Sequence, residues 1–320
     1  MKFLIVLASV VLAISAATDE ELWSEFKKNH GREYRNLREE QVRFSIFQQK
    51  LRKIETHNAR YDKGEETYYL GINQFSDLTQ EEFKARLNYA SKPNIPYSKV
   101  HKASGVKAAS EVNWVSQGAV VGVKDQGNCG SCWAFSTTGS LEGQYAIKYG
   151  SQVSLSEQNL MDCSTDYGNA ACDGGWMIAG FSYVKDQGIE TESDYPYTAQ
   201  SGTSCSFSSS LSVLTISDWT VVNSGDEYSL QDAVANHGPI SVAINADYFD
   251  DYAGGVYNGE CSQEMDHGVL AVGYGTENGL DYWLIKNSWG AEWGESGYLK
   301  LARNQNLCGV ANDASWPTIN

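Results

Sequence analysis

Residues 126–133 read Gln-Gly-Asn-Cys-Gly-Ser-Cys-Trp, and they place the thiol of Cys132 at the predicted start of a helix. His267 follows 135 residues later, and Asn287 opens the stretch Asn-Ser-Trp-Gly another 20 residues on. Unpaired N–H groups at a helix start favour a thiolate, and an imidazole can take up the thiol proton. A side-chain amide can orient that imidazole. The pattern therefore predicts covalent catalysis through a thiol, with these three side chains brought together by folding.

Gln126 lies six residues before the thiol, and its side-chain amide can donate to an oxyanion beside the backbone N–H of Cys132. Each residue also has a simpler interpretation. Cys129 and Cys132 form a Cys-x-x-Cys pair, which indicates redox chemistry in a cytosolic chain. His267 can be a core residue, Asn287 part of a plain turn and Gln126 an exposed loop residue.

The first 17 residues have the pattern of a secretory signal peptide. A basic start at Lys2 precedes an apolar run from Leu4 to Ile14, and Ser15-Ala16-Ala17 supplies small residues for cleavage. No later run approaches the roughly 18 apolar residues of a membrane helix. Seven cysteines fit an oxidising compartment and leave one thiol unpaired after three bridges. With no Asn-x-Ser/Thr sequon for glycan-dependent lysosomal sorting, the sequence favours secretion, for example into a digestive lumen, over a lysosomal location.

Charge is divided unevenly along the chain. Residues 1–107 hold 18 basic and 14 acidic side chains, a net charge of +4, whereas residues 108–320 hold 6 and 26, a net charge of −20. The strong negative charge of residues 108–320 argues against nucleic acid or an anionic membrane as a partner. A need for solubility can also explain this charge. Because acid protonates carboxylates, the attraction between the two parts weakens at low pH. We therefore expect acid to separate them.

The first part of the chain is predicted to be helical. Glu20 to Leu87 is rich in charge and helix formers, and one set of side chains recurs every three or four residues. At 100° per residue this set forms one stripe of a single long helix. The stripe consists of Glu39, Arg43, Phe47, Lys50, Ile54 and Asn58. Asn88 to Ala109, with two prolines and little apolar content, is predicted to be an extended linker.

The second part is predicted to contain a helical lobe and then a strand-rich lobe, an α+β fold. A helix is expected from Ser131 to a stop at Gly150. Short β-rich runs bounded by Gly, Asn and Asp follow Gly188. These predicted strands are 211–222, 240–244, 269–274, 282–286 and 298–302. Because Cys132 lies in the first lobe and His267 in the second, the site is expected in the cleft between the lobes.

Together these motifs resemble a papain-like cysteine protease of the cathepsin L type. The helical stripe and the stretch Gly71-Ile72-Asn73-Gln74-Phe75-Ser76-Asp77 resemble the two propeptide motifs of such zymogens, except that Lys50 stands where the family usually has Asn. The resemblance implies a two-lobed fold with a β-barrel-like second lobe and a helical propeptide domain. It also implies a signal peptide (1–17), an inhibitory propeptide whose linker blocks the cleft (18–107) and a peptidase domain (108–320), with cleavage near Lys107.

The resemblance also selects a pattern of disulfides. Sequence alone allows 105 ways to pair six of seven cysteines. The implied pairs are Cys129 with Cys172, Cys163 with Cys205, and Cys261 with Cys308. Cys132 is then left free. A zinc site is not expected, because the cysteines lack a second close pair, and we expect no cofactor.

Specificity is expected in a pocket for the residue two before the cut. By resemblance, substrate contacts come from Gly174, Gly175, Trp176, Met177, Ala243, Met265, Gly268, Trp289 and Asp313. The mostly apolar lining favours Leu, Phe or Val. Asp313 stands where such enzymes usually have a small apolar residue, so its carboxylate either accepts an arginine or is a short side chain turned to solvent.

Two functions are compatible with these features. The first is an endopeptidase made as an acid-activated zymogen, and the second is a non-catalytic binding or storage protein on the same fold. Retention of Cys132, His267, Asn287 and Gln126 favours the protease. The expected partners are peptide and protein substrates, its own propeptide and protein inhibitors of papain-like proteases, and the enzyme is expected to be a monomer.

Overall fold

The computed structural model describes residues 17–88, 95 and 99–319, so the predicted signal peptide lies almost wholly outside the described residues. Its α-helices are α1 (Asp19–Asn29), α2 (Leu37–Tyr61), α3 (Gln80–Lys84), α4 (Cys132–Tyr149), α5 (Glu157–Cys163), α6 (Met177–Asp186) and α7 (Glu227–His237). Its strands are β1 (Tyr68–Leu70), β2 (Lys99–Val100), β3 (Val112–Asn113), β4 (Ile216–Val221), β5 (Ile240–Ile244), β6 (Tyr252–Tyr257), β7 (His267–Glu277), β8 (Leu280–Lys286), β9 (Tyr298–Ala302) and β10 (Ala314–Ile319). Within the described residues, no helix is long and apolar enough to cross a membrane.

The N-terminal helices form a small aromatic core of their own, centred on Trp23, Phe26 and Phe47. The helical stripe predicted from the sequence is confirmed, since it lies within α2. Its polar members tie α2 to the segments that follow. Arg43 donates to Glu82 of α3 at 2.7 Å, and Asn58 exchanges two hydrogen bonds with the backbone of Leu70 in β1.

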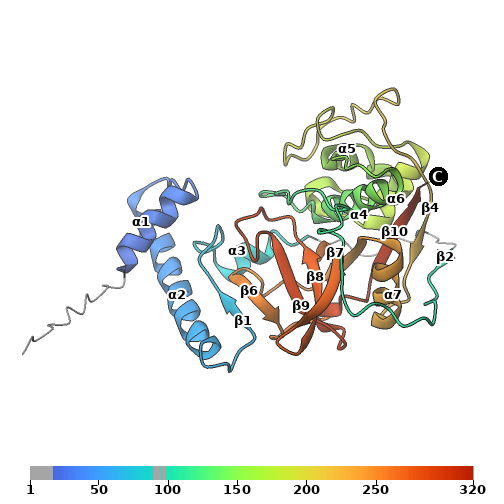
Figure 1. The fold of residues 1–320 in the computed structure, drawn as a ribbon. Coiled ribbons are helices and arrows are strands. Elements are labelled where there is room, and N and C mark those ends of the chain that lie inside the picture. Colours follow the sequence, from blue (N-terminus) through green and yellow to red (C-terminus); the bar gives the residue numbers. More distant parts are fainter. Residues whose placement is uncertain (1–16, 89–94, 96–98, 320) are drawn as a thin grey trace, which may run out of the picture.

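The helical lobe is built around α4. This helix starts at Cys132, as predicted, and ends where Gly150 adopts a left-handed conformation with φ 69°. Helices α4, α5 and α6 pack around an apolar core that contains Trp133, Leu141 and Phe181. The lobe lies above the sheet in Figure 1, and α4 contacts β7, β10 and β5.

The strands form one sheet in the order β1-β6-β9-β8-β7-β5-β10-β4-β2, and β3 pairs with β7. Predicted strands 240–244 and 298–302 match β5 and β9, and β7 and β8 extend beyond 269–274 and 282–286. The predicted strand 211–222 is wrong in its first part, because β4 begins at Ile216. Helix α7 also lies within the region predicted to be strand-rich, where an Asp226 cap starts it.

Both ends of the sheet are strands from the first 107 residues. β1 pairs antiparallel with β6, and β2 pairs parallel with β4. Figure 1 shows α1 and α2 to one side of the sheet, with β1 and α3 between α2 and the strands. The N-terminal part therefore adds a strand at each end of the sheet, while its helices α1 and α2 keep a core of their own.

Three disulfides join Cys129 to Cys172, Cys163 to Cys205, and Cys261 to Cys308. These are the pairs that the resemblance implies. The first two bridges lie in the helical lobe, and the third joins the segment after β6 to the 3-10 turn before β10. Cys132 keeps a free, buried thiol.

Candidate active site

Cys132 opens α4 and is fully buried. Its Sγ accepts a hydrogen bond from the backbone N–H of Gly268 in β7 at 3.3 Å, so the contact spans the two lobes. Burial raises the pKa of the thiol to about 11, although the N–H groups of Gly268 and Trp133 oppose that rise. A raised pKa favours the neutral thiol over the thiolate in this full-length form of the chain.

His267 is the first residue of β7, and Asn287 follows the last residue of β8. The imidazole Nε2 and the Asn287 Oδ1 are 2.8 Å apart, and the ring stacks on Trp289 with centroids 4.7 Å apart. The other nitrogen, Nδ1, is buried without a hydrogen-bond partner among the described residues. Burial lowers the pKa of the imidazole to about 4, and the bond to Asn287 only partly opposes it.

Gln126 is buried and connects to the same network through Ser288. The Ser288 hydroxyl donates to Gln126 Oε1 at 2.6 Å, and the Ser288 N–H donates to Asn287 Oδ1 at 2.8 Å. Gln126 also donates through Nε2 to the carbonyl of Cys129 at 2.8 Å. The simple interpretation of Gln126 as an exposed loop residue is therefore wrong, since it is 1% exposed. The sequence analysis did not predict the bond between Ser288 and Gln126. The only signal for it in the sequence is that Ser288 directly follows Asn287.

The predicted substrate-binding residues lie around this network. Gly174 has a φ of 107°, and a Cβ on Gly175 would come within 2.5 Å of the Trp133 ring, so both positions favour glycine. The apolar members of the set belong to the helical-lobe core or pack against it: Trp176, Met177, Ala243 and Met265. Asp313 is 5% exposed, and its backbone oxygen accepts from the N–H of Ala243 at 3.1 Å. Its side chain is thus not turned to solvent.

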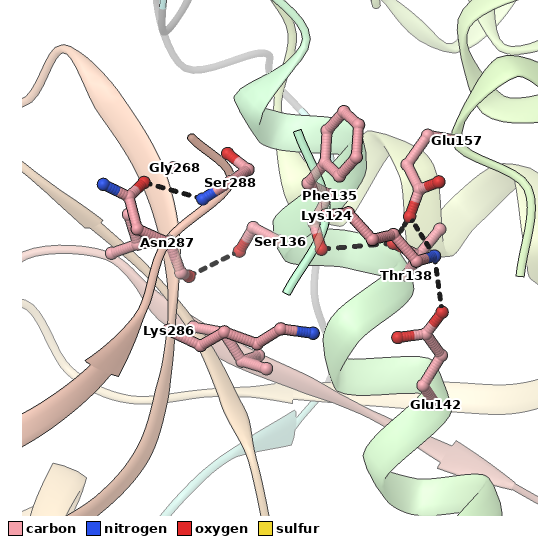
Figure 2. A pocket seen from close by; sticks show the side chains of 12 residues that line it. Lys124, Phe135, Ser136, Thr138, Glu142, Glu157, Gly268, Lys286, Asn287 and Ser288 are labelled. Atoms are coloured by element: carbon pink, nitrogen blue, oxygen red, sulfur yellow. Dashed lines mark hydrogen bonds and ion pairs between the residues drawn. The ribbon is translucent and has the colours of Figure 1, made fainter. Parts of the chain in front are cut away.

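A small cavity lies beside the site, between α4 and strands β7 and β8 (Figure 2). On one side Lys124 donates to Glu142 at 2.8 Å and to Glu157 at 2.7 Å. Burial by itself would lower the pKa of Lys124, but the two carboxylates outweigh it and leave that pKa raised. Burial also raises the pKa of Glu157 to about 7. Lys286 points into the cavity from the other side, and burial lowers its pKa.

Residues of the N-terminal part cover the site. Phe75 and Phe83 pack edge-on against Trp289, each with centroids 5.4 Å away. Arg86 donates to Asn128 at 2.9 Å, and the Asn88 side chain donates to the carbonyl of Cys172 at 3.3 Å. The backbone N–H of Asn88 also interacts with the Cys132 thiol. Most of the predicted linker, 89–94 and 96–98, lies outside the described residues.

Comparison with known families gives two matches along the chain. Residues 108–318 match the family described as papain family cysteine protease. Residues 23–83 match the cathepsin propeptide inhibitor domain. One match lies in each of the two parts that the charge division separates.

Individual relatives span the full length of the chain. A cathepsin L-like proteinase of Phaedon cochleariae is 48% identical and covers 100% of each chain. Digestive cysteine proteinase 1 of Homarus americanus is 47% identical over 98% of this chain and 99% of its own. The structure of digestive procathepsin L 3 from the larval midgut of Tenebrio molitor superimposes with a TM-score of 0.90 at 50% identity, covering 95% of this chain and 100% of that one.

Proposed function

The chain belongs to the papain family of cysteine proteases and is made as a zymogen with its own inhibitor domain, and from that premise we propose the role of each site residue. Its substrates are peptides, and its own propeptide is a partner. The comparisons give no support to a non-catalytic storage protein. In our proposal Cys132 is the nucleophile and His267 is the acid and base.

In the proposed reaction the Cys132 thiol gives its proton to His267 Nδ1, the buried nitrogen without a described partner. The thiolate sulfur then bonds to the substrate carbonyl carbon. As the C–N bond breaks, His267 protonates the leaving amine and a thioester remains. Water, deprotonated by His267, hydrolyses that acyl-enzyme and restores the thiol. The 2.8 Å contact between His267 Nε2 and Asn287 carries the proposal, because it leaves Nδ1 for this proton transfer.

Gln126 is proposed to donate its side-chain N–H to the oxyanion, together with the backbone N–H of Cys132. Ser288 supports this role, because its hydroxyl holds the amide oxygen of Gln126 and so fixes which end of the amide is the donor end. Gly174 and Gly175 are proposed to pair with the substrate backbone. The apolar pocket around Trp176, Met177, Ala243 and Met265 then favours Leu, Phe or Val two residues before the cut.

We propose that the zymogen consists of a propeptide (18–107) and a peptidase domain (108–320), with cleavage near Lys107. The family matches at 23–83 and 108–318 support this division. In the zymogen, burial holds both Cys132 and His267 neutral, and removal of the propeptide admits water, which lowers the cost of the thiolate–imidazolium pair. Acid is proposed to promote that removal, and the rate of maturation at pH 4.5 and pH 7 checks it.

The mature enzyme is proposed to be a secreted monomer that works in a digestive lumen and is open to protein inhibitors of papain-like proteases. The predicted signal peptide and the digestive relatives from lobster and beetle midgut support this location. The sequence has no Asn-x-Ser/Thr sequon, which glycan-dependent sorting to the lysosome would use.

Three variants test the roles. Each zymogen is processed in trans by immobilised wild-type enzyme, which is then removed, and kcat/KM is measured on a peptide with Phe before Arg. We expect Cys132→Ser and His267→Ala each to lower kcat/KM by several orders of magnitude, and Asn287→Ala by about 10- to 100-fold. Normal turnover by folded Cys132→Ser enzyme would refute the assignment, and an Asn287→Ala loss equal to that of Cys132→Ser would refute the orienting role.

A further inference from the structure

Lys50 of the propeptide helix α2 is buried, with 9% of its surface exposed. Lysines are seldom buried unless they are paired. Lys53 lies one helical turn further on and presents a second cation on the same face, about half exposed.

Both cations meet a pair of carboxylates in the segment between β5 and β6. Asp250 and Asp251 are fully buried. Lys50 Nζ contacts Asp250 and donates to Asp251 Oδ1 at 3.0 Å. Lys53 Nζ donates to Asp251 Oδ2 at 2.7 Å and lies 3.7 Å from Asp250 Oδ1. The cluster therefore has two cations for two carboxylates, with one pair of charges on each side of the boundary between propeptide and peptidase.

The propeptide also holds the backbone of the same two aspartates. The side-chain amide of Asn73 donates to the carbonyl of Asp250 at 2.7 Å, and the N–H of Gly71 donates to the carbonyl of Asp251 at 2.9 Å. These backbone contacts fix the position of the segment without regard to its side chains. The charges of Asp250 and Asp251 are therefore free to discriminate between propeptides that share this backbone contact.

We propose that Asp250 and Asp251 make this enzyme selective for its own propeptide, because they require a helix with cations at both positions 50 and 53. A propeptide with a neutral residue at position 50 would leave two buried carboxylates against one half-exposed lysine. An uncompensated buried charge is costly, so such a propeptide would bind weakly. Selection of this kind rests on penalising the wrong partner as much as on attracting the right one.

The test uses the full-length zymogen with Cys132, His267 and Asn287 unchanged, so that it can mature by itself. Its maturation is followed at pH 6 by gel electrophoresis and by titration of newly opened sites with a thiol-directed epoxide. We expect Lys50→Glu to mature at least about tenfold faster than wild type, and Asp250→Lys with Asp251→Lys to do the same. The exchange of all four charges, with Lys50→Glu and Lys53→Glu added to the two aspartate changes, should return the rate to within about threefold of wild type.

Lys63→Glu is the matched control, because Lys63 is an exposed lysine just beyond α2 and the change alters the propeptide charge equally. It should mature at the wild-type rate. Lys50→Asn removes the charge without reversing it and serves where a reversed charge prevents folding, and it should mature at least about threefold faster. After maturation all variants should share the wild-type kcat/KM. An unchanged rate in Lys50→Asn, or an exchange variant as fast as Lys50→Glu, would overturn the proposal.

Discussion

Lys124 and Lys50 each contact two buried carboxylates, yet the two clusters differ in where they lie along the chain. Lys124 meets Glu142 and Glu157, and all three residues lie on the C-terminal side of the proposed cleavage boundary. Lys50 meets Asp250 and Asp251 across the proposed cleavage boundary. Cleavage can therefore dissolve the second cluster but not the first.

The clusters also differ in their charge balance. In the Lys124 cluster one cation contacts two carboxylates. Burial raises the pKa of Glu157 to about 7, although Lys124 opposes that rise. The propeptide cluster has two cations, because Lys53 joins Lys50. A buried ion cluster adds little stability compared with apolar packing. Removing one charged partner, however, lowers the free energy of unfolding strongly, because it leaves a buried charge uncompensated. The same physics thus gives a permanent support in one place and a releasable contact in the other.

The largest effect is expected from breaking the permanent cluster. Lys124→Met should lower the free energy of unfolding by about 3 to 5 kcal/mol, because Glu142 and Glu157 stay buried and lose the cation that contacts them. Urea unfolding of full-length protein carrying Cys132→Ser, which blocks self-cleavage, measures this. Exposed Lys148→Met is the control, with a change of less than about 0.5 kcal/mol. A loss no larger than the control's would contradict a supporting role for Lys124.

A smaller and state-dependent effect is expected at the releasable cluster. Asp250→Asn with Asp251→Asn should destabilise the zymogen by about 2 to 3 kcal/mol, since Lys50 then lacks its carboxylates and Lys53 keeps part of its hydration. The mature enzyme should change by less than about 0.5 kcal/mol, because the lysines have left. Thermal and urea unfolding of both forms measure the difference. Equal losses in the two forms would show that the aspartates support the peptidase fold itself.

The smallest effect concerns pH. The pKa of Glu157 is about 7 in the folded protein and about 4.3 in an unfolded chain, so the protonated form favours folding. Its contribution is complete below about pH 4.3 and is lost as pH rises through about 7. Wild type should therefore gain about 1 to 2 kcal/mol more than Glu157→Gln between pH 8 and pH 5. Glu264 is exposed, so Glu264→Gln should keep the wild-type dependence of unfolding free energy on pH. If Glu157→Gln also kept that dependence, the explanation based on the buried Glu157 carboxylate would be wrong.

The features that could be predicted from the sequence are those that depend on short-range patterns of residue types. The stripe at 3.6-residue period was enough for α2, and Gly150 was enough for the end of α4. The contact between His267 and Asn287, and the place of Cys132 at the start of α4, agree with what residue types and order predict. Helix α7 was missed because its polar sequence lies among strand-like runs and depends on tertiary packing and its Asp226 cap.

The two lysine clusters could not be predicted, since their partners lie far apart in the chain. Lys124 is 33 residues from Glu157, and Lys50 is 200 residues from Asp250. Periodicity within a helix says which side chains share a face, but not which distant side chains meet that face. The departure at Lys50 was visible in the sequence, whereas its pairing required the fold.

Labelling of Cys132 by a thiol-directed epoxide tests the central claim most directly, namely that this thiol is the nucleophile and that the propeptide holds it neutral and covered. The second-order rate of labelling is measured for the zymogen and for the mature enzyme, and the labelled residue is identified by peptide mapping. We expect one label per mature chain, at Cys132, and a rate at least about 100-fold lower in the zymogen, where burial raises the thiol pKa to about 11. Equal rates in the two forms, or a label on another cysteine, would contradict the account.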